Sequence, residues 1–136
     1  MELSAKILIV GGIVSLTYGF ALGLPLTNIR MQSPVAPRHL VTAHLAAIMQ
    51  GTMLLALAGV IGFAELPSWL ITAAALLLCG GCILFVAGAV ANWRQNVVDH
   101  FAERSLGWKL LATSGPMNLI AIITLLIGLV RGVVVA

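Results

Sequence analysis

The sequence predicts an all-α fold, an integral membrane four-helix bundle that forms one domain over residues 1–136. Hydrophobic residues make up 61% of the chain and charged residues only 8%, whereas a soluble domain carries about a quarter charged residues. The charged residues gather in short segments that leave four long apolar runs between them. Each run approaches the roughly 20 apolar residues that a helix needs to cross the hydrocarbon core of a membrane. We therefore expect four spans in a lipid bilayer.

The first span is expected at residues 7–24, directly after Lys6. Pro25 and Asn28 follow it and are expected to end the helix, because proline removes a backbone donor and clashes with the preceding turn. A basic residue before an apolar run also resembles a signal peptide, but this run is long for the apolar region of such a leader. We therefore expect a permanent span.

The second span is expected at 39–63, the third at 67–93 and the fourth at 110–130. Pro67 suits the first turn of the third span, where its missing N–H would have no helical partner. Pro116 lies near the start of the fourth span and predicts a kink or a late start of that helix.

The distribution of basic residues predicts the orientation of the bundle. The connections 25–38 and 94–109 hold five basic residues, namely Arg30, Arg38, Arg94, Arg104 and Lys109. The opposite side holds Lys6 and Arg131. Because loops rich in lysine and arginine stay in the cytoplasm, we expect both connections there and both termini outside, in the cell (inner) membrane. The net charge of +3 is too small and too scattered for a nucleic-acid partner.

Small residues repeat every four positions in the first two spans. The first span carries Gly11, Ser15, Gly19 and Gly23, and the second carries Ala43, Ala47 and Gly51. Close packing of membrane helices requires such residues, so helix contact is the plain interpretation. The alternative, which the spacing leaves open, is a groove for a flat cofactor. Cys79 and Cys82 lie in the middle of the third span and are expected to be core residues rather than a redox pair.

Polar side chains inside the spans are the candidate functional residues. No Asp, Glu, Lys or Arg lies deep in any span, which argues against a proton-coupled transporter with an acidic relay. The neutral or weakly basic residues are His44, Gln50, Asn92 and Asn118, with Ser114 one turn before the last. The predicted topology puts all of them in the same half of the membrane, so we expect them to converge on one pocket.

His44 is the strongest candidate for chemistry. A neutral imidazole nitrogen is the common protein ligand of haem iron. The alternative is a histidine that bonds a neighbouring carbonyl or amide, and the sequence leaves both open. His39 is expected at the membrane interface and His100 in a solvated loop. One histidine clearly within the spans favours a single five-coordinate haem over a two-haem electron-transfer cytochrome.

Two short motifs suggest a family. Ala43-His44 is followed after six residues by Gly51-x-Met53, and the third span ends in Asn-Trp-Arg-Gln-Asn at residues 92–96. The first motif resembles the second span of styrene oxide isomerase, a haem-containing membrane isomerase, and the second motif is a further match. The size, the four spans and the overall character resemble the hydroxylaminobenzene mutase family over essentially the whole chain.

One position departs from styrene oxide isomerase. The pocket tyrosine in the third span of that enzyme aligns with Gly88, and the only tyrosine of this chain is Tyr18, in the first span. The substrate, or the way it is held, should therefore differ from styrene oxide, which favours the mutase.

The resemblance implies a membrane-bound isomerase that converts hydroxylaminobenzene, a small aromatic hydroxylamine, to 2-aminophenol by moving the hydroxyl from nitrogen to the ring. It implies haem b, with His44 as the axial ligand of the iron and further cofactor contacts at Ala47 and Gly51. Ferric haem would act as a Lewis acid that weakens the N–O bond. The resemblance also implies a homotrimer. The catalytic amides that orient the substrate are expected at Gln50, Asn92 and Asn118.

Two other functions stay open at this point. The chain could be a haem-anchoring membrane subunit of an electron-transfer complex, although a second buried histidine would then be expected. It could also be a non-catalytic four-span membrane protein, which predicts that aryl hydroxylamines stay unchanged in its presence.

Overall fold

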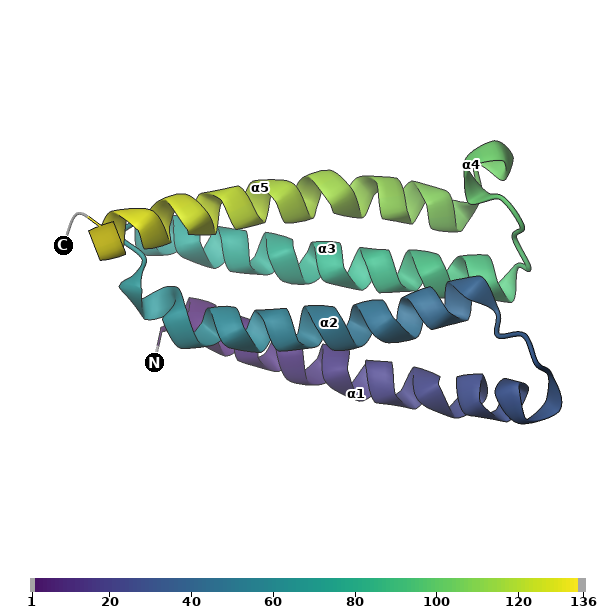
Figure 1. The fold of residues 1–136 in the computed structure, drawn as a ribbon. Helices are drawn as coiled ribbons and strands as arrows, with labels where there is room; N and C mark the ends of the chain where they lie inside the picture. Colours follow the sequence, from purple (N-terminus) through teal and green to yellow (C-terminus); the bar gives the residue numbers. More distant parts are fainter. Residues whose placement is uncertain (1, 135–136) are drawn as a thin grey trace.

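The computed structural model describes residues 2–134, and these residues are almost entirely helical. The elements in chain order are α1 (Leu3–Gln32), α2 (Arg38–Val60), the short 3₁₀ helix η1 (Ile61–Phe63), α3 (Ser68–Arg94), α4 (His100–Glu103) and α5 (Leu106–Val134) (Figure 1). Four of these helices, α1, α2 with η1, α3 and α5, are each long and apolar enough to cross a membrane. The predicted fold class, an all-α membrane four-helix bundle, is confirmed.

The long helices form two antiparallel pairs. Figure 1 shows α1 beside α2 and α3 beside α5, and α3 also contacts both members of the first pair. The described ends of the chain lie at the same end of the bundle as η1, whereas the α1–α2 connection and α4 lie at the opposite end. We call the latter the loop end. It carries the two connections that hold most of the basic residues.

The sequence predicts that the first helix ends at Pro25, and this prediction is wrong. Helix α1 continues through Asn28 to Gln32. The missing N–H of Pro25 removes one backbone hydrogen bond. The apolar stripe of the helix nevertheless continues past this position, because Leu22 is buried, and Leu26 and Ile29 pack against the same core cluster. Packing of that stripe outweighs the loss of one hydrogen bond.

Helix α5 likewise has no late start at Pro116, because it begins at Leu106. The hydroxyl of Ser105 accepts a hydrogen bond from the backbone N–H of Trp108 at 3.0 Å. A serine that precedes a helix in this way satisfies one of the free N–H groups of the first turn. This cap, well before the proline, sets the start of the helix.

Small residues bring the helices into backbone contact. Of the residues named below, Gly51 belongs to a predicted stripe, whereas Gly12 and Gly107 lie outside the predicted stripes. A Cβ atom on Gly51 of α2 would lie 2.9 Å from the carbonyl oxygen of Gly12, and a Cβ on Gly12 would lie 2.9 Å from that of Gly51. On the other side of the bundle, a Cβ on Gly88 of α3 would lie 2.7 Å from the carbonyl oxygen of Gly107. Neither pair leaves room for any side chain.

Cys79 and Cys82 are free thiols in the interior of the bundle. Cys82 is buried, and Cys79 packs against the same core cluster. This placement agrees with the expectation that they are core residues.

The loop end contains two local structures that are set by asparagine and aspartate. Asn96 takes a left-handed conformation with φ 51° at the end of α3, where its N–H and that of Val97 donate to the carbonyls of Trp93 and Asn92. This is the hydrogen-bond pattern of a Schellman motif, and asparagine tolerates its left-handed position. The connection therefore turns sharply away from α3.

Asp99 begins the short helix α4. Its carboxylate accepts hydrogen bonds from the backbone N–H groups of Phe101 and Ala102. The bonds from Ala102 and Phe101 hold the pKa of Asp99 below its ordinary value, because they favour the charged carboxylate.

Candidate functional site

His44 is held by helix α1. Its Nδ1 lies 2.7 Å from the carbonyl oxygen of Gly19, and a carbonyl accepts hydrogen bonds only, so Nδ1 carries the proton and donates. Nε2 is then the nitrogen with the free lone pair. A Cβ atom on Gly23 would lie 3.2 Å from Cε1 of the ring, so the imidazole fits against a helix surface that has no side chain.

The second nitrogen of this ring, Nε2, has no hydrogen-bond partner among the described residues. The His44 side chain is only half-buried, and Nε2 is not one of the buried unpartnered atoms. It therefore reaches the surface of the single chain. The bond to Gly19 is the alternative that the sequence left open, a histidine bonded to a neighbouring carbonyl. A backbone carbonyl that fixes one imidazole nitrogen and orients the other also occurs behind metal-ligating histidines, so this bond agrees with both interpretations.

The described residues contain no group of three or more His, Cys, Asp or Glu side chains that is able to hold a bare metal ion. That absence does not bear on haem, whose porphyrin supplies four nitrogens while the protein adds an imidazole. The oriented Nε2 of His44, which has no partner among the described residues, has the chemistry of such a ligand.

Ala47 and Gly51, the expected cofactor contacts, lie under α1. Ala47 is fully buried, and its carbonyl accepts a hydrogen bond from the Ser15 hydroxyl at 2.8 Å. Gly51 meets Gly12 and Leu16 so closely that α1 occupies the space beside it. These two residues hold α1 against α2 and thereby fix the surface on which His44 sits.

The three expected catalytic amides each have one buried atom without a hydrogen-bond partner. These atoms are Oε1 of Gln50, Nδ2 of Asn92 and Oδ1 of Asn118. A buried polar atom without a partner costs about 1–3 kcal/mol, so such atoms are rare in folded proteins. Their occurrence at all three expected positions makes these amides candidates for contact with a ligand or with water.

The structure does not bring His44 and the amides into one pocket, which differs from our expectation. Asn118 lies against Gly81 and Asn92 against Gly107, so both face the α3–α5 contact, whereas His44 faces α1. Gln50 is six residues after His44 on the same helix, and at 3.6 residues per turn the two side chains point about 120° apart. The sequence predicted that these residues share one half of the membrane, but it did not predict the direction in which each side chain points.

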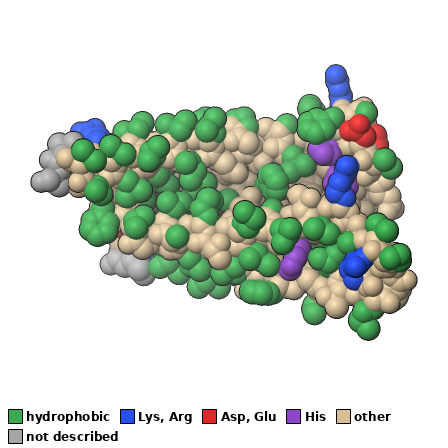
Figure 2. All heavy atoms as spheres, viewed as in Figure 1, with side chains coloured by type: hydrophobic (Ala, Val, Ile, Leu, Met, Phe, Trp, Pro, Cys, Tyr) green, Lys and Arg blue, Asp and Glu red, His purple; other side chains and the backbone are tan. Residues whose placement is uncertain are grey.

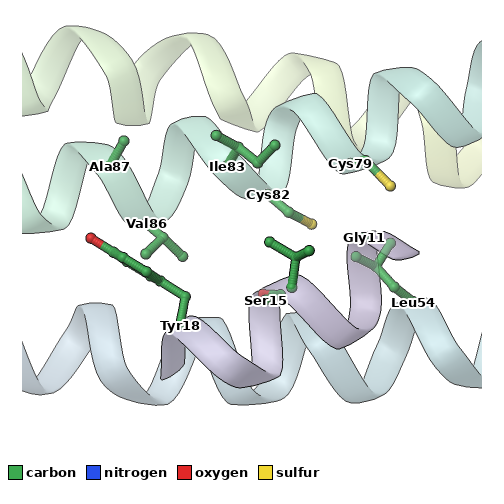
Figure 3. Close-up of a pocket in the computed structure, with 10 residues that line it drawn as sticks. Gly11, Ser15, Tyr18, Leu54, Cys79, Cys82, Ile83, Val86 and Ala87 are labelled. Carbon is green, nitrogen blue, oxygen red and sulfur yellow. The ribbon is translucent and has the colours of Figure 1, made fainter. Parts of the chain in front are cut away.

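An apolar groove of about 370 Å³ lies between α1 and α3. Tyr18 of α1 lies along α3 next to Val86, with its hydroxyl directed toward Ala87, and Cys82 and Ile83 line the same groove (Figure 3). The sequence did not mark Tyr18 as a pocket residue. Its one signal was a phenol among aliphatic neighbours in the first span.

A second cavity, of about 350 Å³, lies at the loop end and is more polar. It is lined by Pro37, Arg38, His39, Asn92, Trp93, Asn96, Val97 and Val98. His39, expected at the interface, is 9% exposed and its Nε2 lies 3.0 Å from the carbonyl oxygen of Val97. The ring of His100 stands edge-on to that of His39, with 5.5 Å between the centroids.

Comparisons with family models, curated protein sequences and solved structures give no match for this chain. The candidate sites therefore stand on their residues and geometry.

Proposed function

We propose that this protein is a membrane-bound isomerase that rearranges hydroxylaminobenzene to 2-aminophenol, with haem b iron bound axially by His44. The observation that carries the proposal is the hydrogen bond from His44 Nδ1 to the Gly19 carbonyl. It selects the tautomer in which Nε2 is an unprotonated ligand nitrogen and holds the ring in one orientation. The motif that begins at Ala43-His44 supports the same assignment through its resemblance to styrene oxide isomerase.

Exposed apolar side chains stand next in the sequence to His44 and to its two contacts on α1, Gly19 and Gly23. Phe20 and Leu24 on α1 are 67% and 74% exposed, and Leu45 on α2 is 51% exposed. Lipid, a porphyrin or a second copy of the chain would cover these side chains in the membrane. The homotrimer implied by the resemblance is part of this proposal, because contact between copies would shield a cofactor there from water.

In this mechanism, bound ferric haem would supply a Lewis acid for the oxygen or nitrogen of the substrate. The chain contributes orientation: Gly19 fixes His44, and the small residues beneath α1 keep that carbonyl in place. The apolar environment admits an aromatic substrate from the bilayer and limits attack by bulk water. Atoms are conserved in the rearrangement, so no reductant or nucleotide is required.

Gln50, Asn92 and Asn118 stay predicted catalytic residues of this proposal, although none of them shares a pocket with His44. Gln50 points about 120° away from His44 on the same helix, and Asn92 and Asn118 lie at the α3–α5 contact. The cell (inner) membrane location, with the loop end in the cytoplasm, is also part of the proposal and is supported by the excess of basic residues at that end.

The first test is an optical spectrum of the protein purified in detergent. We expect a Soret band that is lost or shifted in His44→Ala and retained in His100→Ala, a matched histidine in the loop.

Mutase activity is measured separately as 2-aminophenol formed by membranes that contain the protein. A colourless, iron-free and active protein would refute the haem and keep the mutase, whereas substrate that stays unchanged relative to empty membranes would refute the mutase. Reversible reduction by quinols together with a co-purifying partner would instead support the electron-transfer alternative.

A further inference from the structure

The polar cavity at the loop end does not include His44, although Asn92, a predicted catalytic residue of the proposed function, lines it. It lies where α2 begins and α3 ends, and its lining comes from both helices and from residues 96–98. Figure 2 shows that most charged side chains on the visible face gather at the end of the bundle that carries α4, while hydrophobic side chains cover the flank (Figure 2). The cavity therefore sits at the boundary between the apolar flank and the charged end.

Asn92 supplies a free donor to this cavity. The residue is fully buried, and its Oδ1 accepts a hydrogen bond from the hydroxyl of Ser105 at 2.6 Å. The same hydroxyl oxygen accepts the Trp108 N–H, so its one proton is available for the Asn92 oxygen. The oxygen end of the amide is thereby engaged, and Nδ2 is left without a partner.

The start of α2 supplies further positive potential. Pro37 precedes the helix and gives no side-chain cap to the N–H groups of the first turn. The partial positive charge of a 23-residue helix is therefore not neutralised by its own cap. Arg38 and His39 stand in this turn and line the cavity.

Two backbone acceptors at the cavity are already occupied. The carbonyl of Val97 is bonded by His39, and that of Val98 accepts a hydrogen bond from the Arg38 guanidinium at 2.7 Å. The nearby carboxylate of Glu103 is turned into the loop, where its Oε1 accepts the N–H groups of Val98 and Asp99. The unpartnered buried group of the lining is a donor, Nδ2 of Asn92, and Arg38 adds a positive charge, which together suit an oxyanion.

The charge and position of the loop end point to the source of that oxyanion. Basic residues outnumber acidic ones five to two in residues 25–38 and 94–109, whereas the other end has two of each. Trp93 lines the cavity, and Val98 and Phe101 are 81% and 70% exposed beside it. Tryptophan and exposed apolar side chains near basic residues are typical of the headgroup region of a membrane.

We propose that this cavity binds a phosphate oxyanion, with Asn92 Nδ2, Arg38 and the first turn of α2 as its donors, and that an anionic membrane lipid supplies the phosphate. Arg38 would bind the charge, while the buried amide of Asn92 would bind one phosphate oxygen that enters between α2 and α3. The lipid would thereby connect the α1–α2 pair to the α3–α5 pair at the loop end.

The test measures the thermal unfolding midpoint of the full chain in a maltoside detergent, which has no phosphate. Phosphatidylglycerol, phosphatidylcholine and inorganic phosphate are titrated separately. We expect phosphatidylglycerol to raise the midpoint more than phosphatidylcholine, whose choline is repelled by Arg38. Loss of a charge-assisted hydrogen bond weakens binding by roughly tenfold or more, so Arg38→Gln should show that loss of apparent affinity for phosphatidylglycerol.

Two further variants make the result specific. Asn96→Gly removes a side chain that lines the cavity, and glycine accepts the φ of 51° at this position, so we expect weaker binding with an intact helix end. Arg94→Gln removes an equal charge at an exposed residue outside the cavity and should leave the lipid effect unchanged. A response to inorganic phosphate alone that depends on Arg38 would support the oxyanion site and assign it to free phosphate. An equal loss of apparent affinity in Arg94→Gln would overturn the proposal. So would the absence of stabilisation by phosphatidylglycerol, phosphatidylcholine and inorganic phosphate.

Discussion

The contact between Gly12 and Gly51 gives the most direct test of the packing. In Gly51→Ala the new methyl group would lie 2.7 Å from Leu16 Cγ and 2.9 Å from both the Gly12 carbonyl oxygen and the Leu16 backbone nitrogen. Two of these three atoms belong to the backbone, so no side-chain rotation relieves the clash. Helices α1 and α2 must move apart.

The magnitude follows from two opposing contributions. Overpacking of this kind costs about 1–3 kcal/mol, while replacement of glycine by alanine inside a helix gains about 1 kcal/mol. Gly59→Ala on the same helix isolates the second contribution, because nothing lies within 4 Å of the new methyl group. The two variants should therefore differ by about 1–3 kcal/mol, or roughly 5- to 150-fold in the ratio of folded to unfolded protein.

The assay is unfolding by SDS in mixed micelles, followed by the fluorescence of the three tryptophans. We expect Gly51→Ala to unfold at a lower SDS fraction than the wild type, and Gly59→Ala at an equal or higher one. If the two variants unfolded at the same SDS fraction, the backbones of α1 and α2 would not be in contact at Gly51. The placement of His44 against α1 would then lose its support as well.

Three other expectations follow from the contacts described above. Because Oδ1 of Asn118 is buried without a partner, Asn118→Leu should leave the SDS midpoint unchanged or raise it; a clear loss of stability would mean that the amide has a partner in the protein. Ser105→Ala removes the cap on Trp108 and should lower the unfolding free energy by about 1–2 kcal/mol, and an unchanged midpoint would contradict this role. The pKa of Asp99 is lowered from 3.8 by backbone hydrogen bonds, so its support for α4 should be present above pH 3.8 and be lost as pH falls through the lower folded value. The protection factors of the α4 amides should fall over that acid range in the wild type, and Asp99→Ala, which removes the capping oxygen, should show low protection already at neutral pH.

Much of the architecture was predictable from the sequence. A charged fraction of 8% and four long apolar runs are sufficient to predict four membrane helices, because an unpaired backbone in lipid requires helical hydrogen bonds. The small residues at four-residue spacing likewise predicted close contact between helices. Helix ends were less predictable: Pro25 lies inside α1 because its neighbours Leu26 and Ile29 have packing partners on other helices.

The candidate site was predictable residue by residue but not as an arrangement. The polarity of His44, Gln50, Asn92 and Asn118 is visible in the sequence, and so is their depth in the spans. Which helix each side chain faces depends on the rotation of four helices about their axes, and that rotation is fixed only by the glycine contacts between them. The sequence therefore did not predict that His44 faces α1 while Asn92 and Asn118 face the contact between α3 and α5.

By itself, the sequence determined that this chain is a membrane bundle with a few uncharged polar groups inside it, since the free energy of transfer into lipid depends on composition and order along the chain. Only the tertiary structure decided which tautomer of His44 is present, that the Asn92 amide is engaged through its oxygen while its nitrogen is left without a partner, and that residues of the loop end line a cavity. Each of these results from partners that are far apart in the sequence, as in the hydrogen bond between His44 and Gly19.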